Sequence, residues 1–192
     1  MIEIRELSFD AVAELVRRRL AAAPIPDKLA RFIYERAGRN PLYCGELVSA
    51  LLETNVVPAA GGDRAAEAAL MQATAELSIP TSLEGAIIAR VDALQIEEQL
   101  ILKAASAIGE PFDSGALRDA FAGAPPAANV EGVLRLLVVR DFLRTTAATT
   151  FVFRHAVTGD VIYRLLPFAQ RRQLHTSLVI ALERRHAGRL DG

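Results

Sequence analysis

Apolar residues recur every three or four positions through most of the chain, which predicts short amphipathic helices. The start differs, because residues 2–7 (IEIREL) alternate between apolar and polar and predict a short strand. Ser8 then has the chemistry of a helix N-cap, and the helix after it runs to about Leu20. The chain therefore opens with a strand that leads into a helix.

The stretch AGRNP at residues 37–41 separates two further predicted helices. The first begins near Pro26 and ends at Gly38, a residue that readily adopts the left-handed conformation of a helix end. The second begins with Asn40 as N-cap and Pro41 in its first turn, where the missing N–H costs nothing.

Residues 54–76 are rich in Ala, Gly and Pro and predict a linker with at most one weak helix. After them, Thr81 and Glu84 have the spacing of a capping box, followed by an apolar stripe. Three more helical patterns follow, in the last of which we expect four residues to be buried. Two strand-like runs, near 142–145 and 150–154, come next. The four residues expected to be buried are Val130, Leu134, Leu137 and Val138.

Helices followed by a two-strand hairpin are typical of a winged helix. We predict a mainly α chain with a helical region over residues 1–60 and a linker over 61–76. A winged-helix domain with a small β-hairpin covers 77–165, and a C-terminal helix covers 166–192.

Composition narrows the class of protein. Hydrophobic residues make up 52% of the 192 residues, enough for a sizeable core, and the net charge of −1 provides no field that attracts nucleic acid. One cysteine excludes an internal disulfide, and no apolar run is long enough to span a membrane. We expect a cytoplasmic protein.

The sequence contains no self-sufficient active site. It has no phosphate-binding G-x-x-x-x-G-K-[ST] loop, no G-x-S-x-G, no H-E-x-x-H and no C-x-x-C motif. Its three histidines and one cysteine lie on different predicted elements, so no metal site is expected. We predict no catalytic residues and no enzyme activity for this chain alone.

Three stretches in order carry a family resemblance: AGRNPLYCGELVSALLE (37–53), the region 79–113, and FVFRHAVTGDVIYRLLPFAQRRQLHTSLVIALE (151–183). Together they resemble the region after the P-loop core in STAND-class, AAA+-related signalling ATPases. Similar regions occur in bacterial class III adenylyl and guanylyl cyclases and in large LuxR-type regulators. The resemblance implies a lid followed by a winged helix, in a protein regulated by ATP or ADP.

In that family the lid closes over the nucleotide base through a Gly-x-Pro motif. The resemblance places this motif at GRNP, so that Gly38, Asn40 and Pro41 become candidate nucleotide-binding residues. A proline ring offers a flat apolar face to an adenine. The alternative is that Asn40 and Pro41 simply start a helix.

The winged helix of related proteins carries a histidine that reaches the β-phosphate of ADP. Here the resemblance points to FRHA, with His155 as the phosphate contact and Arg154 as a second candidate. Ala156 stands where the Met-His-Asp form of the motif has its acid. The alternative is a histidine that caps the following helix or fills a gap in the core.

The resemblance also implies partners. The initial strand resembles the last strand of a P-loop core, so the core and its Mg²⁺ ligands would lie upstream of residue 1 in the same polypeptide, with any cyclase domain before it. TPR-like helical repeats would follow the last helix. Without the core we expect no bound cofactor and very weak ATP binding.

Two other functions remain as alternatives. The segment from Arg164 to Gly192 has six arginines against two acids and could dock a partner or a second copy of the chain. A winged helix could instead bind DNA. The helix near 127–139 offers Asn129, Arg135 and Arg140 but also Glu131 and Asp141, which makes DNA the less favoured ligand.

Overall fold

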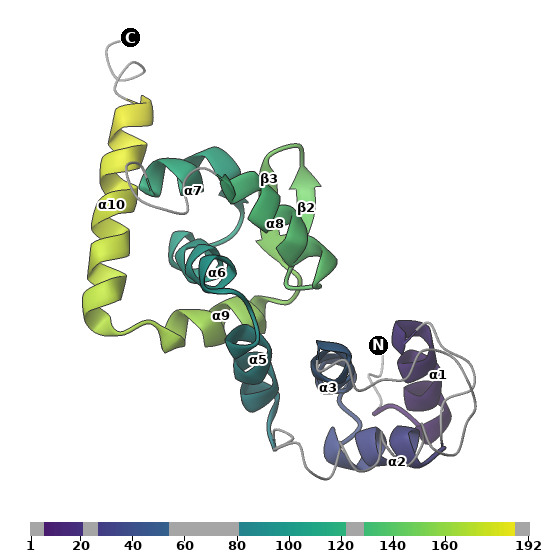
Figure 1. Cartoon of the computed structure of the whole chain (residues 1–192). Helices are drawn as coiled ribbons and strands as arrows, with labels where there is room; N and C mark the ends of the chain where they lie inside the picture. Colours follow the sequence, from purple (N-terminus) through teal and green to yellow (C-terminus); the bar gives the residue numbers. More distant parts are fainter. Residues whose placement is uncertain (1–5, 21–26, 54–80, 122–128, 187–192) are drawn as a thin grey trace, which may run out of the picture. The chain divides into compact units, whose positions relative to one another are not determined.

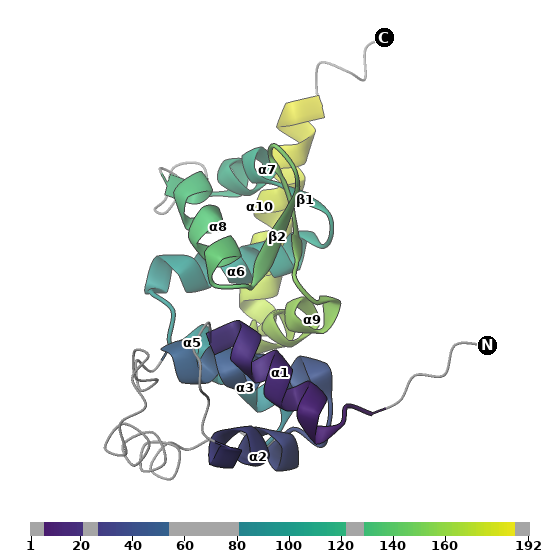
Figure 2. The same cartoon turned by 90° about the vertical axis from the view of Figure 1, so that its right-hand side faces the viewer.

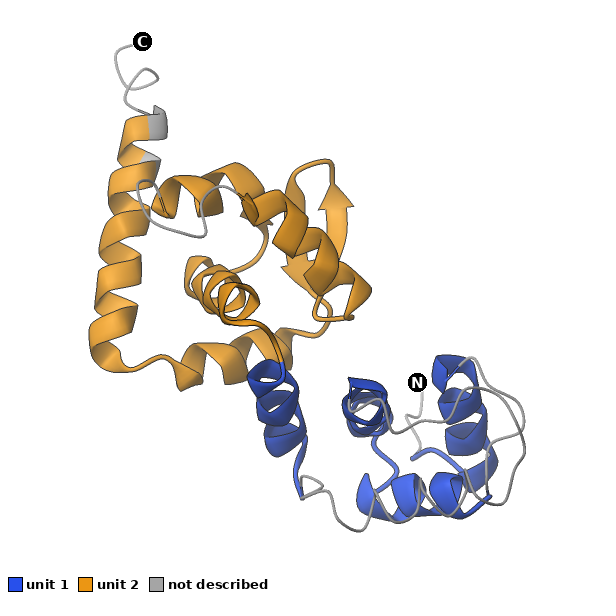
Figure 3. Cartoon of the chain, in the orientation of Figure 1, with its two compact units in different colours: residues 1–93 blue, residues 94–192 orange. Residues whose placement is uncertain are grey.

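The structure, a computed structural model, describes residues 6–20, 27–53, 81–121 and 129–186 (Figure 1). The described residues are mainly helical, with one small antiparallel sheet, which confirms the predicted fold class at this level. The chain divides into unit 1, Met1–Ala93, and unit 2, Leu94–Gly192 (Figure 3). Within the described ranges, no helix combines the length and apolar character needed to cross a membrane.

Unit 1 is a small group of helices. Helix α1 (Phe9–Leu20) packs against α2 (Asp27–Arg36) and α3 (Pro41–Glu53), and α3 also packs against α5 (Leu83–Asp92) (Figure 2). The N-cap prediction at Ser8 is confirmed, because its Oγ accepts a hydrogen bond from the Ala11 N–H at 3.3 Å. The unit's core includes Val12, Val16, Leu29, Ile33, Leu47, Val48 and Leu51.

Helix α5 differs from the sequence prediction in two ways. We grouped it with the downstream domain over 77–165, whereas it belongs to unit 1. The predicted capping box at Thr81 is wrong, because the N-cap is Ser82, whose side chain accepts from the Gly85 N–H at 3.0 Å. The helix therefore starts one residue later and completes the packing of α3.

Charged side chains also hold α5 to α3. The Arg90 side chain is only 1% exposed, and its Nη1 lies 2.5 Å from Glu46 Oε2. Its Nε lies 3.1 Å from Glu53 Oε1. The two glutamates are seven residues apart, so they lie on one face of α3 two turns from each other. One arginine therefore bridges two carboxylates inside unit 1.

Unit 2 surrounds its first helix. Helix α6 (Ile96–Ile108) contacts α7 (Ser114–Ala120), α8 (Val130–Val139), α9 (Ala156–Leu165) and α10 (Phe168–His186). The sheet has the strand order β1-β3-β2 and all its pairs are antiparallel. Its strands are β1 (Phe112–Asp113), β2 (Leu143–Ala147) and β3 (Thr150–Phe153).

Aromatic rings fill the space beside the sheet. Phe112 stacks on Phe151 with ring centroids 6.0 Å apart, and it lies 6.2 Å from the ring of Phe153. Helix α8 covers the core with Val130, Leu134 and Leu137, as predicted. The fourth buried position is Val133, however, whereas Val138 is only half-buried.

Several predictions fall outside the described residues. These are the first part of the N-terminal strand (residues 2–5), the helix start at Pro26, the linker over 61–76, and the end of the chain (187–192). Residues 6–8 are described and belong to no strand.

Candidate functional site

The turn at residues 37–41 has a fixed backbone. Gly38 adopts the predicted left-handed conformation, with φ of 55°, and Arg39 follows it with φ of 63°. The Asn40 N–H donates to the Ala37 carbonyl at 3.0 Å. Asn40 Oδ1 accepts from the N–H groups of residues 42 and 43 at 3.0 and 3.2 Å, so the predicted N-cap is confirmed. Pro41 follows as the first residue of α3 and is exposed.

Arg39 ties this turn to the segment before α1. Its Nη1 lies 2.8 Å from Glu6 Oε2, and its guanidinium lies over the Tyr34 ring, 5.5 Å from the centroid. The Arg39 carbonyl accepts from the Leu7 N–H at 3.4 Å. The Glu6 carboxylate raises the pKa of the Arg39 guanidinium, so Arg39 stays charged. No local sequence pattern indicates this arrangement, because Glu6 and Arg39 lie 33 positions apart.

The second candidate group lies where β3 passes into α9. Arg154 extends the pairing of β3, since its N–H donates to the Phe142 carbonyl at 2.8 Å. Its Nε lies 3.2 Å from Asp141 Oδ1, which partly compensates its charge, and its side chain remains 47% exposed. Arg154 is therefore placed for an anion but already has an acidic partner.

His155 is the N-cap residue of α9. Its backbone is extended, with φ of −135° and ψ of 131°, and its carbonyl accepts from the Thr158 N–H at 2.9 Å. Its side chain makes no capping hydrogen bond and is half-buried. The helix has no acid in its first turn. The imidazole is consequently not used to complete the helix end.

The candidate residues therefore form two groups. Gly38, Asn40 and Pro41 share one turn of unit 1, whereas Arg154 and His155 share one junction of unit 2. The described residues contain no group of three or more His, Cys, Asp or Glu side chains that could hold a metal ion.

Two further features escaped the sequence analysis. The first is the ion pairing of Arg90, whose position beside an apolar stripe gives no indication of its partners. The seven-residue spacing of Glu46 and Glu53 does indicate that one face of α3 is charged. A groove in unit 2 is built from residues between 106 and 175, and no local pattern joins them.

One comparison with known proteins gives a match. Residues 8–64 fit the model of a family described as a domain of unknown function, DUF8739. The match includes α1, α2, α3 and the turn at Gly38–Pro41, and it covers well under half of the chain. No match was found among curated proteins or among solved structures. The family similarity thus concerns unit 1 and assigns it no activity.

Proposed function

We propose that this chain is the regulatory lid and winged-helix region of a STAND-class, ATP-binding signalling protein. It would close over a nucleotide held by a P-loop core in another part of the polypeptide and pass the nucleotide state to an output domain such as a nucleotide cyclase. The observation that carries this proposal is His155. It begins α9 directly after the β2–β3 hairpin and leaves its side chain free of any capping bond.

The topology of unit 2 supports the winged-helix part of the proposal. Its elements follow the order α6, β1, α7, α8, β2, β3, and the sheet order is β1-β3-β2. This is the arrangement of three helices and a hairpin that a winged helix requires. The β2–β3 hairpin is then the wing, and His155 follows its second strand.

The chemistry of the junction suits a phosphate. The first N–H groups of a helix carry partial positive charge and bind anions. A histidine at the N-cap can add a further donor at the same place, and Arg154 adds a positive charge beside it. Because Asp141 already pairs with Arg154, we assign the main contact to His155.

The turn in unit 1 suits the nucleotide base. Asn40 is occupied in capping α3, so it holds the turn in place rather than binding a ligand directly. Pro41 has no N–H and is exposed, so its ring is available to an adenine. Gly38 provides the left-handed conformation that lets the chain leave α2 and enter α3.

DNA binding receives less support from the surface of α8. Leu136 and Val139 are 49% and 82% exposed on the helix that would enter the major groove. Apolar side chains there cannot read base edges other than the thymine methyl group. We therefore propose protein and nucleotide contacts, rather than DNA, as the basis of its function.

Nuclear magnetic resonance of the whole chain tests the proposal with the two halves of ADP. We expect pyrophosphate to shift the amide signals of residues 154–158 and adenosine to shift those of residues 38–40, 42 and 43. Both affinities should be about 1 mM or weaker, because so few contacts are available without a core. His155→Ala should abolish the first response and Pro41→Ala the second.

Matched variants provide the controls. His175→Ala removes an exposed histidine of α10, and Pro167→Ala removes an exposed proline near a helix start, so neither should alter the responses. The proposal is wrong if the shifts appear elsewhere, or if ADP binds with low-micromolar affinity that the two test variants leave unchanged.

A further inference from the structure

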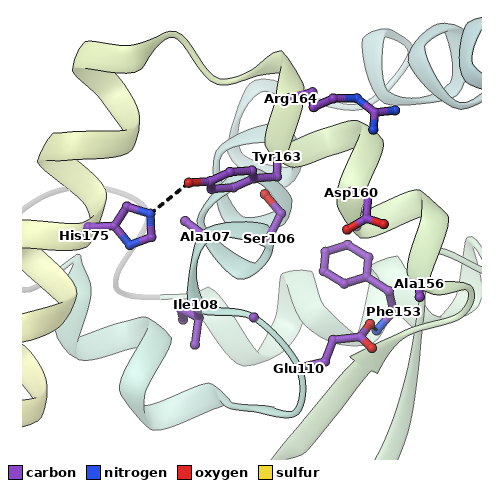
Figure 4. A pocket seen from close by; sticks show the side chains of 12 residues that line it. Ser106, Ala107, Ile108, Glu110, Phe153, Ala156, Asp160, Tyr163, Arg164 and His175 are labelled. Carbon is purple, nitrogen blue, oxygen red and sulfur yellow. Dashed lines mark hydrogen bonds between the residues drawn. The ribbon is translucent and has the colours of Figure 1, made fainter.

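Unit 2 contains a groove with a volume of about 490 Å³ (Figure 4). It lies between the end of α6, the end of β3, helix α9 and one side of α10. None of the five candidate nucleotide-binding residues lines it. The groove therefore has a lining of its own, although it adjoins the Arg154–His155 junction at Phe153 and Ala156, and it needs its own explanation.

Close packing around Phe153 shapes the groove. Glu110 Oε1 accepts a hydrogen bond from the Phe153 N–H at 2.5 Å, which holds the turn after α6 against β3. On the other side, α9 approaches the ring so closely that a Cβ on Gly159 would lie 2.9 Å from Phe153 Cδ2. The Phe153 ring thus lies between the two walls (Figure 4).

Two carboxylates give this end of the groove a negative charge. Asp160 comes from α9 and Glu110 from the turn after α6, with the Phe153 ring between them (Figure 4). Within the described part of the chain, neither carboxylate has a cationic partner. The C-terminal end of α6 adds partial negative charge from its last carbonyls. Arg164, one helical turn after Asp160 on α9, also lines the groove and adds one positive charge to it.

Apart from Arg164 and His175, the rest of the lining is apolar or carries hydroxyl groups. Ala107 and Ile108 provide apolar surface, while Ser106 and Tyr163 provide hydroxyl groups. The Tyr163 hydroxyl lies 3.2 Å from His175 Nε2, so these two side chains close the end near α10. The two carboxylates therefore lie at the Phe153 end of the groove, and the hydrogen-bonding groups of Ser106, Tyr163 and His175 lie along the remainder.

We propose that this groove binds a lysine or arginine side chain carried by a segment of a partner protein. The cation would lie at the Phe153 end of the groove, within reach of Asp160 and Glu110, where the two carboxylates attract it. Its aliphatic stem would contact the apolar walls, and the neutral hydroxyls suit the amides of a peptide. A free polyamine, which carries charge along its whole length, fits this uneven distribution less well.

The direct test uses N-acetyl-arginine methylamide as the probe, followed by amide signals of the full chain. We expect saturable shifts at residues 106–110 and 156–164. The matched citrulline compound, which is neutral and has nearly the same shape, should bind at least about tenfold more weakly. Equal binding of the two compounds, tighter binding of spermidine, or the absence of saturable shifts would each overturn the proposal.

Variants locate the charge requirement. Glu110→Gln combined with Asp160→Asn should weaken the arginine probe about tenfold or more. Both changes preserve shape, and the oxygen of the new glutamine amide can still accept from the Phe153 N–H. Glu97→Gln removes an exposed acid of α6 outside the groove and should have no effect. An unchanged affinity in the double variant would refute the assignment.

Salt provides a second measurement that needs no variant. Binding of the arginine probe to the unmodified chain should weaken as sodium chloride rises, while binding of citrulline should not. Salt-independent binding of the arginine probe would also contradict the proposal. This inference does not rest on the proposed nucleotide contacts, because its probes contain neither phosphate nor adenine.

Discussion

Units 1 and 2 stabilise their helices through different chemistry. Unit 1 buries Arg90 between Glu46 and Glu53, so part of its packing depends on charges that satisfy one another. Unit 2 packs phenylalanine rings against its sheet and brings α9 close to Phe153 at Gly159. Unit 1 should therefore be most sensitive to the loss of a charge, and unit 2 to the addition of volume.

The two candidate groups differ in a similar way. In unit 1 the polar side chain of Asn40 is used to cap α3. In unit 2 the side chain of His155 holds the equivalent position at α9 and makes no such bond. A polar residue that a helix needs can be explained by the fold, whereas one that the helix does not need calls for a function.

The largest effect is expected from Arg90→Ala. The change leaves the buried Glu46 and the half-buried Glu53 without their arginine, which should destabilise unit 1 by about 3–5 kcal/mol. Cys44 gives a direct readout, because it is the chain's one cysteine and is fully buried in unit 1. Because the thiol is fully buried, labelling with a disulfide reagent requires the unit to open. Burial also raises the pKa of the Cys44 thiol, which further lowers its reactivity in the closed unit. Labelling should accelerate more than about a hundredfold.

A triple variant separates charge from packing. Replacing the network with Glu46→Leu, Glu53→Leu and Arg90→Met removes every charge together and should recover most of the lost stability. Arg18→Ala, which removes an exposed ion pair with Glu14, should change the labelling rate very little. If Arg90→Ala labelled no faster than Arg18→Ala, the buried network would not stabilise unit 1.

The next effect is expected in unit 2, from Gly159→Ala. The new methyl would lie 2.9 Å from Cδ2 of a buried phenylalanine, Phe153, and the surrounding core leaves that ring little room to move. Overpacking of this kind costs about 1–3 kcal/mol. Urea unfolding followed by far-UV circular dichroism should show a lower midpoint.

Gly45 in unit 1 is the matched control, because it is also a helical glycine near another side chain. A Cβ there would lie 3.4 Å from the Arg19 guanidinium, which is the far end of a flexible side chain. Gly45→Ala should therefore be neutral, or more stable by up to about 1 kcal/mol from helix propensity. Equal losses from the two variants would show that added volume does not distinguish the units.

Local patterns predicted the helices and their ends well. The stop at Gly38, the cap at Asn40 and the two strands of the hairpin all follow from a few neighbouring residues. Strand β1 was missed because two residues show no periodicity. The prediction placed Val138 rather than Val133 in the core because α8 is apolar on most of its surface, so its pattern does not identify one buried face.

Features that depend on distant residues could not be predicted. The Arg90 network joins α3 to a helix that follows a long interval, and a charged residue in a sequence normally indicates a solvated surface. The groove beside Phe153 likewise depends on the folding of α6, α9 and α10. The positions of Asn40 and His155 at helix starts were predictable, but the use of each side chain required the structure.

The smallest effect should distinguish these two N-cap residues. Asn40→Ala removes the acceptor of two backbone N–H groups and should cost about 1 kcal/mol. His155→Ala removes a half-buried side chain that makes no capping bond, so its cost should be clearly smaller, within about 0.5 kcal/mol. Urea unfolding of the two variants side by side measures the difference.

The result also bears on the nucleotide proposal. A stable His155→Ala chain that no longer responds to pyrophosphate would assign the histidine to ligand binding, because the fold would not explain its presence. If instead His155→Ala lost as much stability as Asn40→Ala, the imidazole would be a structural part of unit 2. The failure of the His155→Ala variant to bind phosphate would then reflect a disturbed start of α9, and the contrast between Asn40 and His155 would disappear.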